Sequence, residues 1–172
     1  ILEASDAVKI LAKNDDIIQS AEIMDYNSLK SVQNLKDIPE ILFEIKEGYT
    51  CILIQTQSDL QSELDENLRI IKDSLKDTNM AIEPLYSQDE NEFSKWWKIR
   101  KGLLPIASMA RDDGSSVITE DVCFEIDKLG DGITNIENLF KKYNFNGIIF
   151  GHALSGNVHF IITPNLNNKQ EK

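Results

Sequence analysis

Two short apolar runs near the end of the chain, separated by a turn, constrain the fold most. Residues 148–150 and 160–162 consist of Ile and Phe, which favour β-strands, and Ser155-Gly156 lies between them. An apolar run, a Ser-Gly pair and a second apolar run are typical of a β-hairpin. We therefore expect antiparallel strands over residues 147–152 and 157–163, ended by a proline at 164.

His152 and His159, the two histidines of the sequence, flank this turn. With Ser155-Gly156 as a two-residue turn, they lie directly opposite each other, with Cβ atoms about 5 Å apart on the same face. Two such imidazoles can converge on one metal ion or one anionic ligand, or they can simply pack at the end of a sheet. A metal site needs a third ligand, and Glu120 and Asp121 are the local candidates unless they only form a solvated strand end.

Composition excludes several classes of protein. The sequence has 29 acidic and 18 basic residues, a net charge of -11, which argues against a general nucleic-acid surface. No apolar stretch approaches the roughly 20 residues that cross a bilayer, and no Gly-rich nucleotide-binding signature occurs. Cys51 and Cys123 lack a C-x-x-C spacing, so neither a disulfide scaffold nor a zinc knuckle is indicated. We expect a reducing, cytoplasmic compartment.

Strand-like and helical segments alternate along the chain. Besides the hairpin, we expect strands over 17–24, 49–55, 80–85 and 116–124, and helices over 5–12, 58–77, 89–111 and 126–143. Pro105 should kink or break the third helix. This order predicts an α+β fold, a mostly antiparallel sheet with helices on one face in a ferredoxin-like arrangement, as a single domain over residues 1–172.

Arg100 is the second candidate for a binding site. It lies one helical turn from Trp96 and Trp97, so its guanidinium is expected beside an apolar wall. In that setting it can pair bidentately with a carboxylate of a substrate. The alternative, which composition alone favours, is a surface arginine lying over a tryptophan.

Four segments together resemble one known family. They are Ala21 to Asp25, the W-x-x-R-x-x-L-x-P order from Trp97 to Pro105, Glu120 to Val122, and Phe150 to His159. The resemblance is to the C-terminal, substrate-cap domain of FAD-linked oxidases, a group that includes D-lactate dehydrogenases, glycolate oxidase subunits and D-2-hydroxyglutarate dehydrogenases. It covers nearly the whole chain, and the histidine segment is its most specific part.

The resemblance implies roles for three residues. His152 and His159 would bind a divalent metal such as zinc, iron or manganese that helps to hold a 2-hydroxy acid, and Arg100 would hold the carboxylate of that acid. The glutamate ligand and the catalytic histidine of the family would follow Lys172, and an FAD-binding domain would precede Ile1. Ala153-Leu154-Ser155, where many members have x-Gly-Asp, resembles large bacterial D-lactate dehydrogenases that often carry an iron–sulfur domain.

We therefore expect a fragment of a larger flavoprotein. It would be the cap of an FAD-dependent D-2-hydroxyacid dehydrogenase, with D-lactate as the first substrate to test, and inactive without the FAD-binding domain of the same protein. The intact enzyme would be cytoplasmic or peripheral to the inner membrane. Two alternatives remain at this stage, a ferredoxin-like sensory or interaction module with a histidine-based ligand site, and a stand-alone metal hydrolase.

Overall fold

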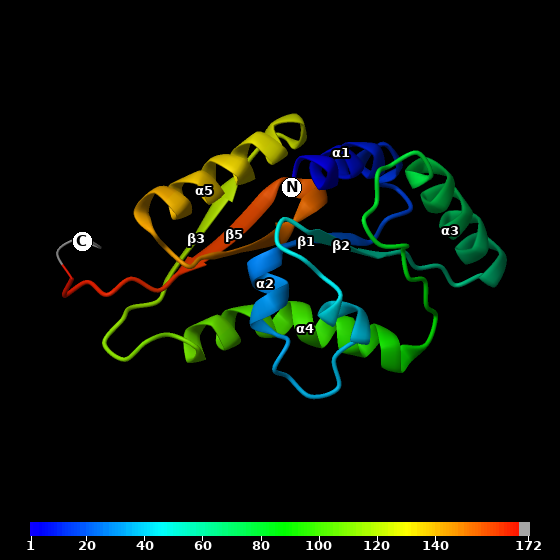
Figure 1. Ribbon diagram of the computed structural model, residues 1–172. Coiled ribbons are helices and arrows are strands. Elements are labelled where there is room, and N and C mark those ends of the chain that lie inside the picture. Colours follow the sequence, from blue (N-terminus) through cyan, green and yellow to red (C-terminus); the bar gives the residue numbers. More distant parts are fainter. Residues whose placement is uncertain (169–172) are drawn as a thin grey trace.

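The computed structural model describes residues 1–168 and contains, within that range, a five-stranded antiparallel sheet (Figure 1). The strands lie in the order β2-β1-β4-β5-β3. Their bounds are β1 Ser20–Asp25, β2 Thr50–Gln55, β3 Ile118–Cys123, β4 Ile148–His152 and β5 Asn157–Ile162. The predicted α+β class with a mostly antiparallel sheet is confirmed, and so are the two strands of the C-terminal hairpin.

Helices cover both faces of the sheet, so the predicted arrangement with helices on one face is wrong (Figure 1). One layer consists of α1 Leu2–Leu11, α3 Gln61–Leu75 and α5 Leu129–Tyr143, and the other of α2 Tyr26–Ser31 and α4 Glu90–Met109. Short 3-10 turns complete the chain at Ala12–Asn14, Glu40–Phe43, Ile126–Lys128 and Ala153–Ser155.

The central strand β4 explains the two layers. Ile148, Ile149 and Phe150 are consecutive and all buried, and consecutive strand residues point to opposite faces. Both faces of the sheet are therefore apolar and must be covered. Ile149 packs in the cluster that includes α1, α3 and α5, whereas Ile148 and Phe150 pack in the cluster that includes α2 and α4.

α4 continues through Pro105 to Met109. Of the two predicted effects of this proline, a kink or a break, the break does not occur. Asp89 caps its first turn by accepting hydrogen bonds from the backbone N–H groups of Asn91 and Glu92. On both sides of the proline, apolar residues pack against the sheet: Ile99 and Leu103 before it, and Ile106 and Ala107 after it. Tertiary packing thus offsets the lost backbone hydrogen bond.

The strand predicted over residues 80–85 does not form, and this segment has no strand partner. Met80 and Leu85 are exposed, so no apolar face drives them onto the sheet. Pro84 lacks the N–H group that a ladder hydrogen bond needs. The β-favouring composition of the segment is therefore not sufficient for a strand.

Asp25 joins β1 to the α2 layer. Its carboxylate accepts a hydrogen bond from the Ser28 backbone N–H at 2.8 Å and caps α2. The Ser28 hydroxyl in turn donates to the carbonyl oxygen of Ile149 at 3.0 Å. Burial raises the pKa of Asp25 from 3.8 to about 6, although the hydrogen bonds from Ser28 oppose this increase.

The raised pKa of Asp25 predicts a pH-dependent stability. Because the folded state holds this proton more tightly than the unfolded chain, stability falls as pH rises from 3.8 to about 6. Asp25→Asn keeps a capping acceptor that cannot ionise, so it should be more stable than the wild type by up to roughly 3 kcal/mol at pH 7 and by little at pH 4. Urea unfolding across this range measures the difference. The exposed Asp59→Asn serves as a control, and an Asp25→Asn difference that stays constant with pH would contradict the prediction.

Candidate functional site

His152 and His159 lie on the face of the sheet that α2 and α4 cover. The pairing of β4 with β5 sets His152 opposite Asn157 and His159 opposite Phe150, so the predicted direct opposition of the histidines is wrong. The connection is a 3-10 turn followed by Gly156 in the left-handed region, which is longer than the two-residue turn we expected. The register differs by two residues, so each side chain keeps its face. The imidazole centroids lie 5.3 Å apart.

Each imidazole contacts a carboxylate through Nδ1. His152 Nδ1 lies 2.9 Å from Oε1 of Glu22 on β1, and His159 Nδ1 contacts Oδ1 of Asp121 on β3. An ionised carboxylate can only accept a hydrogen bond, so each Nδ1 donates, and Nε2 of the neutral ring keeps its lone pair. Carboxylates orient metal-ligating histidines in this manner.

The strand register separates the two carboxylates considered as a third ligand. Asp121 pairs with His159 and shares its face. Glu120 pairs with Phe160, which packs against the cluster on the opposite face of the sheet. Only Asp121 of these two therefore belongs to the site, where it contacts an imidazole.

Arg100 extends from α4 to the same face. Its Nε donates a hydrogen bond to Oε2 of Glu22 at 2.7 Å, and the side chains of the pair are 11% and 5% exposed. The guanidinium carbon lies 4.7 Å from the centroid of the Phe150 ring, a cation–π arrangement. Arg100 is therefore not a surface arginine over a tryptophan; it is Lys101 that lies over Trp97.

These contacts close a ring of five side chains. Arg100 binds Glu22, Glu22 binds His152, His152 contacts His159, and the His159 ring lies 5.5 Å from the Phe150 ring beneath Arg100. The Glu22–Arg100 side is buried, whereas His152 is 54% exposed. Solvent and small ligands can thus reach the imidazoles while the guanidinium lies in a drier environment, where its hydrogen bonds to an anion are stronger.

Asn157 adds an unsatisfied acceptor beside His152, its neighbour across the hairpin. Its Oδ1 is buried and has no hydrogen-bond partner in the described part of the chain. Within residues 1–168, no group of three or more His, Cys, Asp or Glu side chains is arranged to hold a metal. The described residues therefore bring together two imidazoles and an open acceptor, which are fewer protein ligands than a metal site needs.

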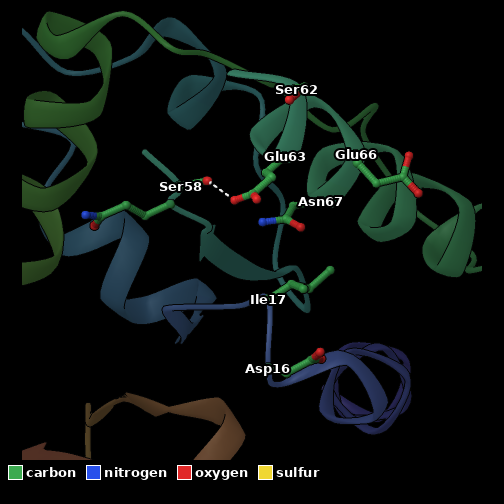
Figure 2. Close-up of a pocket in the computed structure, with 8 residues that line it drawn as sticks. Asp16, Ile17, Ser58, Ser62, Glu63, Glu66 and Asn67 are labelled. Atoms are coloured by element: carbon green, nitrogen blue, oxygen red, sulfur yellow. Dashed lines mark hydrogen bonds between the residues drawn. The ribbon is translucent and has the colours of Figure 1, made fainter. Parts of the chain in front are cut away.

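A hollow lies on the opposite side of the sheet, next to the first turns of α3 (Figure 2). Its volume is about 420 Å³. The lining residues are Asp16, Ile17, Gln57, Ser58, Ser62, Glu63, Glu66 and Asn67. Three carboxylates and no cation line it, so it does not suit an acidic ligand. The ring of side chains around Glu22 is the better candidate.

Glu22 is the site residue that the sequence analysis did not identify. It is 3% exposed and lies within a run of buried residues from Ala21 to Asp25. A charged side chain inside a buried apolar run is uncommon unless it is paired. Its place among apolar residues could therefore have marked Glu22 as a paired, buried carboxylate. Its partners, Arg100 and His152, could not be found from the sequence because they are far away along the chain.

The sequence matches one known family. The family model described as FAD linked oxidases, C-terminal domain, matches residues 1–172. The chain belongs to this family. Proteins of this family are oxidoreductases that use FAD, so the family predicted from the sequence motifs is confirmed. No curated protein matches the chain. Between residues 1 and 168 of the domain, no helix combines the length and apolar character that a membrane crossing requires.

Gly156 in this FAD-linked oxidase domain sets the turn that holds the two histidines. Its φ is 67°, and a Cβ there would collide with the carbonyl oxygen of Phe124. Phe124 also donates its backbone N–H to the Gly156 carbonyl oxygen at 2.9 Å. The close approach of these two backbones therefore leaves no space for a side chain.

We predict that Gly156→Ala destabilises the domain by about 3 kcal/mol, because it adds a backbone collision to the cost of a left-handed alanine. Gly48→Ala is a matched control: Gly48 has a φ of 89° and nothing within 4 Å of its Cβ position. That variant should lose only about 1 kcal/mol, the left-handed cost alone. Urea unfolding compares the two variants, and equal losses would show that the Phe124 contact does not constrain the turn.

Proposed function

We propose that this domain is the substrate cap of an FAD-dependent D-2-hydroxyacid dehydrogenase, with D-lactate as the first substrate to test. The observation that supports it is the buried Arg100–Glu22 pair beside two imidazoles on one sheet face. A 2-hydroxy acid carries a carboxylate and a hydroxyl on adjacent carbons. Arg100 suits the carboxylate, and the histidine pair suits the hydroxyl end.

Arg100 can receive the acid through its terminal nitrogens. Its Nε is engaged by Glu22, and the hydrogen bonds of the described residues include none from its Nη1 or Nη2. The Nη pair forms a fork that matches a carboxylate. In this proposal Arg100 orients the acid, and the Phe150 ring beneath it limits access of water to the guanidinium.

FAD, held by an FAD-binding domain of the full-length protein as the family resemblance implies, would supply the acceptor for the hydride. His152 and His159 would hold a divalent metal such as zinc, iron or manganese, because both rings leave Nε2 available and suit such ions. The metal would supply Lewis acidity toward the hydroxyl oxygen. Asn157, the neighbour of His152 across the hairpin, adds a buried Oδ1 acceptor to the same part of the site. By the family resemblance, a further ligand and the catalytic histidine would come from a segment after Lys172.

Family membership favours this enzyme over a sensory module or a metal hydrolase. As part of the same proposal, the enzyme works in the cytoplasm, in accord with two cysteines that lack a disulfide spacing. The Ala153-Leu154-Ser155 variant of the turn supports the branch of D-lactate dehydrogenases in which an iron–sulfur domain accompanies the flavin domain.

Arg100→Ala in the full-length protein should lower kcat/KM for D-lactate roughly 100-fold, because a charge-assisted hydrogen-bond pair to the acid is lost. Arg100→Lys keeps the charge without the planar fork and should recover only part of the loss. Dye-coupled D-lactate oxidation measures both variants. Lys98→Ala, at an exposed position of the same helix, is the control and should leave kcat/KM unchanged. A wild-type value for Arg100→Ala would end this assignment.

His152→Ala and His159→Ala should each lower the metal content of the purified full-length protein. Removing one of two imidazoles leaves too few ligands to retain the ion. Elemental analysis of the protein gives the metal-to-protein ratio. Cys123→Ser, which lies beside Asn157 on the neighbouring strand, is the matched control and should retain the metal. Full metal content in both alanine variants would rule out these ligands.

A further inference from the structure

We propose that Glu22 is a positioning residue that fixes Arg100 and His152 in one geometry and so couples acid binding to metal binding. The identities of these ligands rest on the proposed function, whereas the contacts of Glu22 are present in the structure. The sequence motifs assign no role to Glu22; it lies in the segment from Ala21 to Asp25 that resembles the family.

The carboxylate of Glu22 uses both of its oxygens. Oε2 accepts from Arg100 Nε at 2.7 Å, and Oε1 accepts from His152 Nδ1 at 2.9 Å. Its side chain is 5% exposed, so water cannot easily replace either partner. One rigid group therefore sets the position of the guanidinium and the orientation of the imidazole together.

Only a carboxylate of this length satisfies both partners. Both facing groups are N–H donors, and a buried carboxylate is stable only when it is paired in this way. Glutamine has one acceptor oxygen, so its NH2 group would face either Arg100 Nε, which can only donate, or His152 Nδ1. The imidazole could accept from that NH2 group only by moving its proton to Nε2, which removes the lone pair that a metal would need. Aspartate keeps the charge but is shorter by one methylene group, so it can approach one partner and not both.

Asp121 provides a natural comparison. It binds His159 Nδ1 as Glu22 binds His152 Nδ1, but its side chain is 64% exposed, and within residues 1–168 no ion pair links it to an arginine. Both carboxylates orient an imidazole, and only Glu22 also holds Arg100. Asp121→Asn therefore reports the loss of imidazole orientation alone, which makes it the matched control for Glu22→Gln.

The experiment uses the full-length protein with Zn²⁺ and D-lactate as probes. Competition with a chromogenic chelator measures Zn²⁺ affinity, and dye-coupled kinetics at saturating Zn²⁺ measure KM and kcat for D-lactate. Both Asp121→Asn and Glu22→Gln should bind Zn²⁺ about 10- to 100-fold more weakly. At saturating Zn²⁺, the KM of Glu22→Gln should exceed that of Asp121→Asn about 10-fold or more, because both variants lose the orientation of one imidazole and only Glu22→Gln also releases Arg100.

Glu22→Asp tests whether the length of the side chain matters for bridging Arg100 and His152. It also replaces Glu22→Gln in the experiment if that variant does not fold. It should recover either Zn²⁺ affinity or the KM for D-lactate, and not both. Full recovery of both by Glu22→Asp, or a Glu22→Gln protein that matches Asp121→Asn in KM, would overturn the coupling.

A double-mutant cycle measures the coupling without any ligand. Arg100→Gln and His152→Gln, alone and together, should change the unfolding equilibrium constant non-additively by at least about threefold, and additively when Glu22→Gln is also present. Additivity in both backgrounds would overturn the inference even for an active enzyme. A wild-type protein that binds neither Zn²⁺ nor D-lactate would overturn the proposed function, and the cycle would still decide the role of Glu22.

Discussion

The buried ion pair between Glu22 and Arg100 is the contact on which the rest of the site depends. It joins α4 to strand β1 by charge, beside the apolar contacts of Ile99 and Leu103. A buried ion pair contributes little net stability compared with apolar residues of the same size, although loss of one partner is costly. Stability alone therefore does not explain why the chain retains this pair. The proposed recognition of an acidic ligand by Arg100 would explain why the pair is retained.

The two faces of the sheet serve different purposes. The face under α1, α3 and α5 carries the larger apolar cluster, which includes Ile149 and Val158. The face under α2 and α4 is apolar at Ile148 and Phe150 and becomes polar toward the turn that joins β4 to β5. Strand alternation brings side chains from β1, β3, β4 and β5 to this polar region. The side chains of the candidate site that come from the sheet therefore lie on strands, and strands hold side chains more rigidly than loops do.

The sequence predicts this architecture in part, for reasons that particular residues illustrate. Local patterns were sufficient for the hairpin, because apolar runs and a turn are signals of neighbouring residues. They were not sufficient for the register, since the chain uses a 3-10 turn at Ala153–Ser155 in place of a two-residue turn. The histidines still share a face because the error was an even number of residues. Helices on both faces follow from Ile148, Ile149 and Phe150, whose uninterrupted apolar character indicates a strand buried on both sides.

The site itself depends on pairings that no local pattern contains. Arg100 was identified by a motif, but its partner Glu22 is 78 residues away and could be found only when the sheet was assembled. The choice between Glu120 and Asp121 likewise required the pairing of β3 with β5. The metal-binding and acid-binding roles of these residues stay predictions, whereas their convergence is a property of the fold.

The sequence separation of the Glu22 contacts also bears on when the site can form. Glu22 must meet His152 across 130 residues and Arg100 across 78. Contacts between such distant segments require the closure of long loops and tend to form slowly. During synthesis, Glu22 and Arg100 both leave the ribosome before β4 exists. The ring of side chains around Glu22 is thus completed only when the C-terminal hairpin docks, and a chain interrupted before residue 148 would lack both histidines of it.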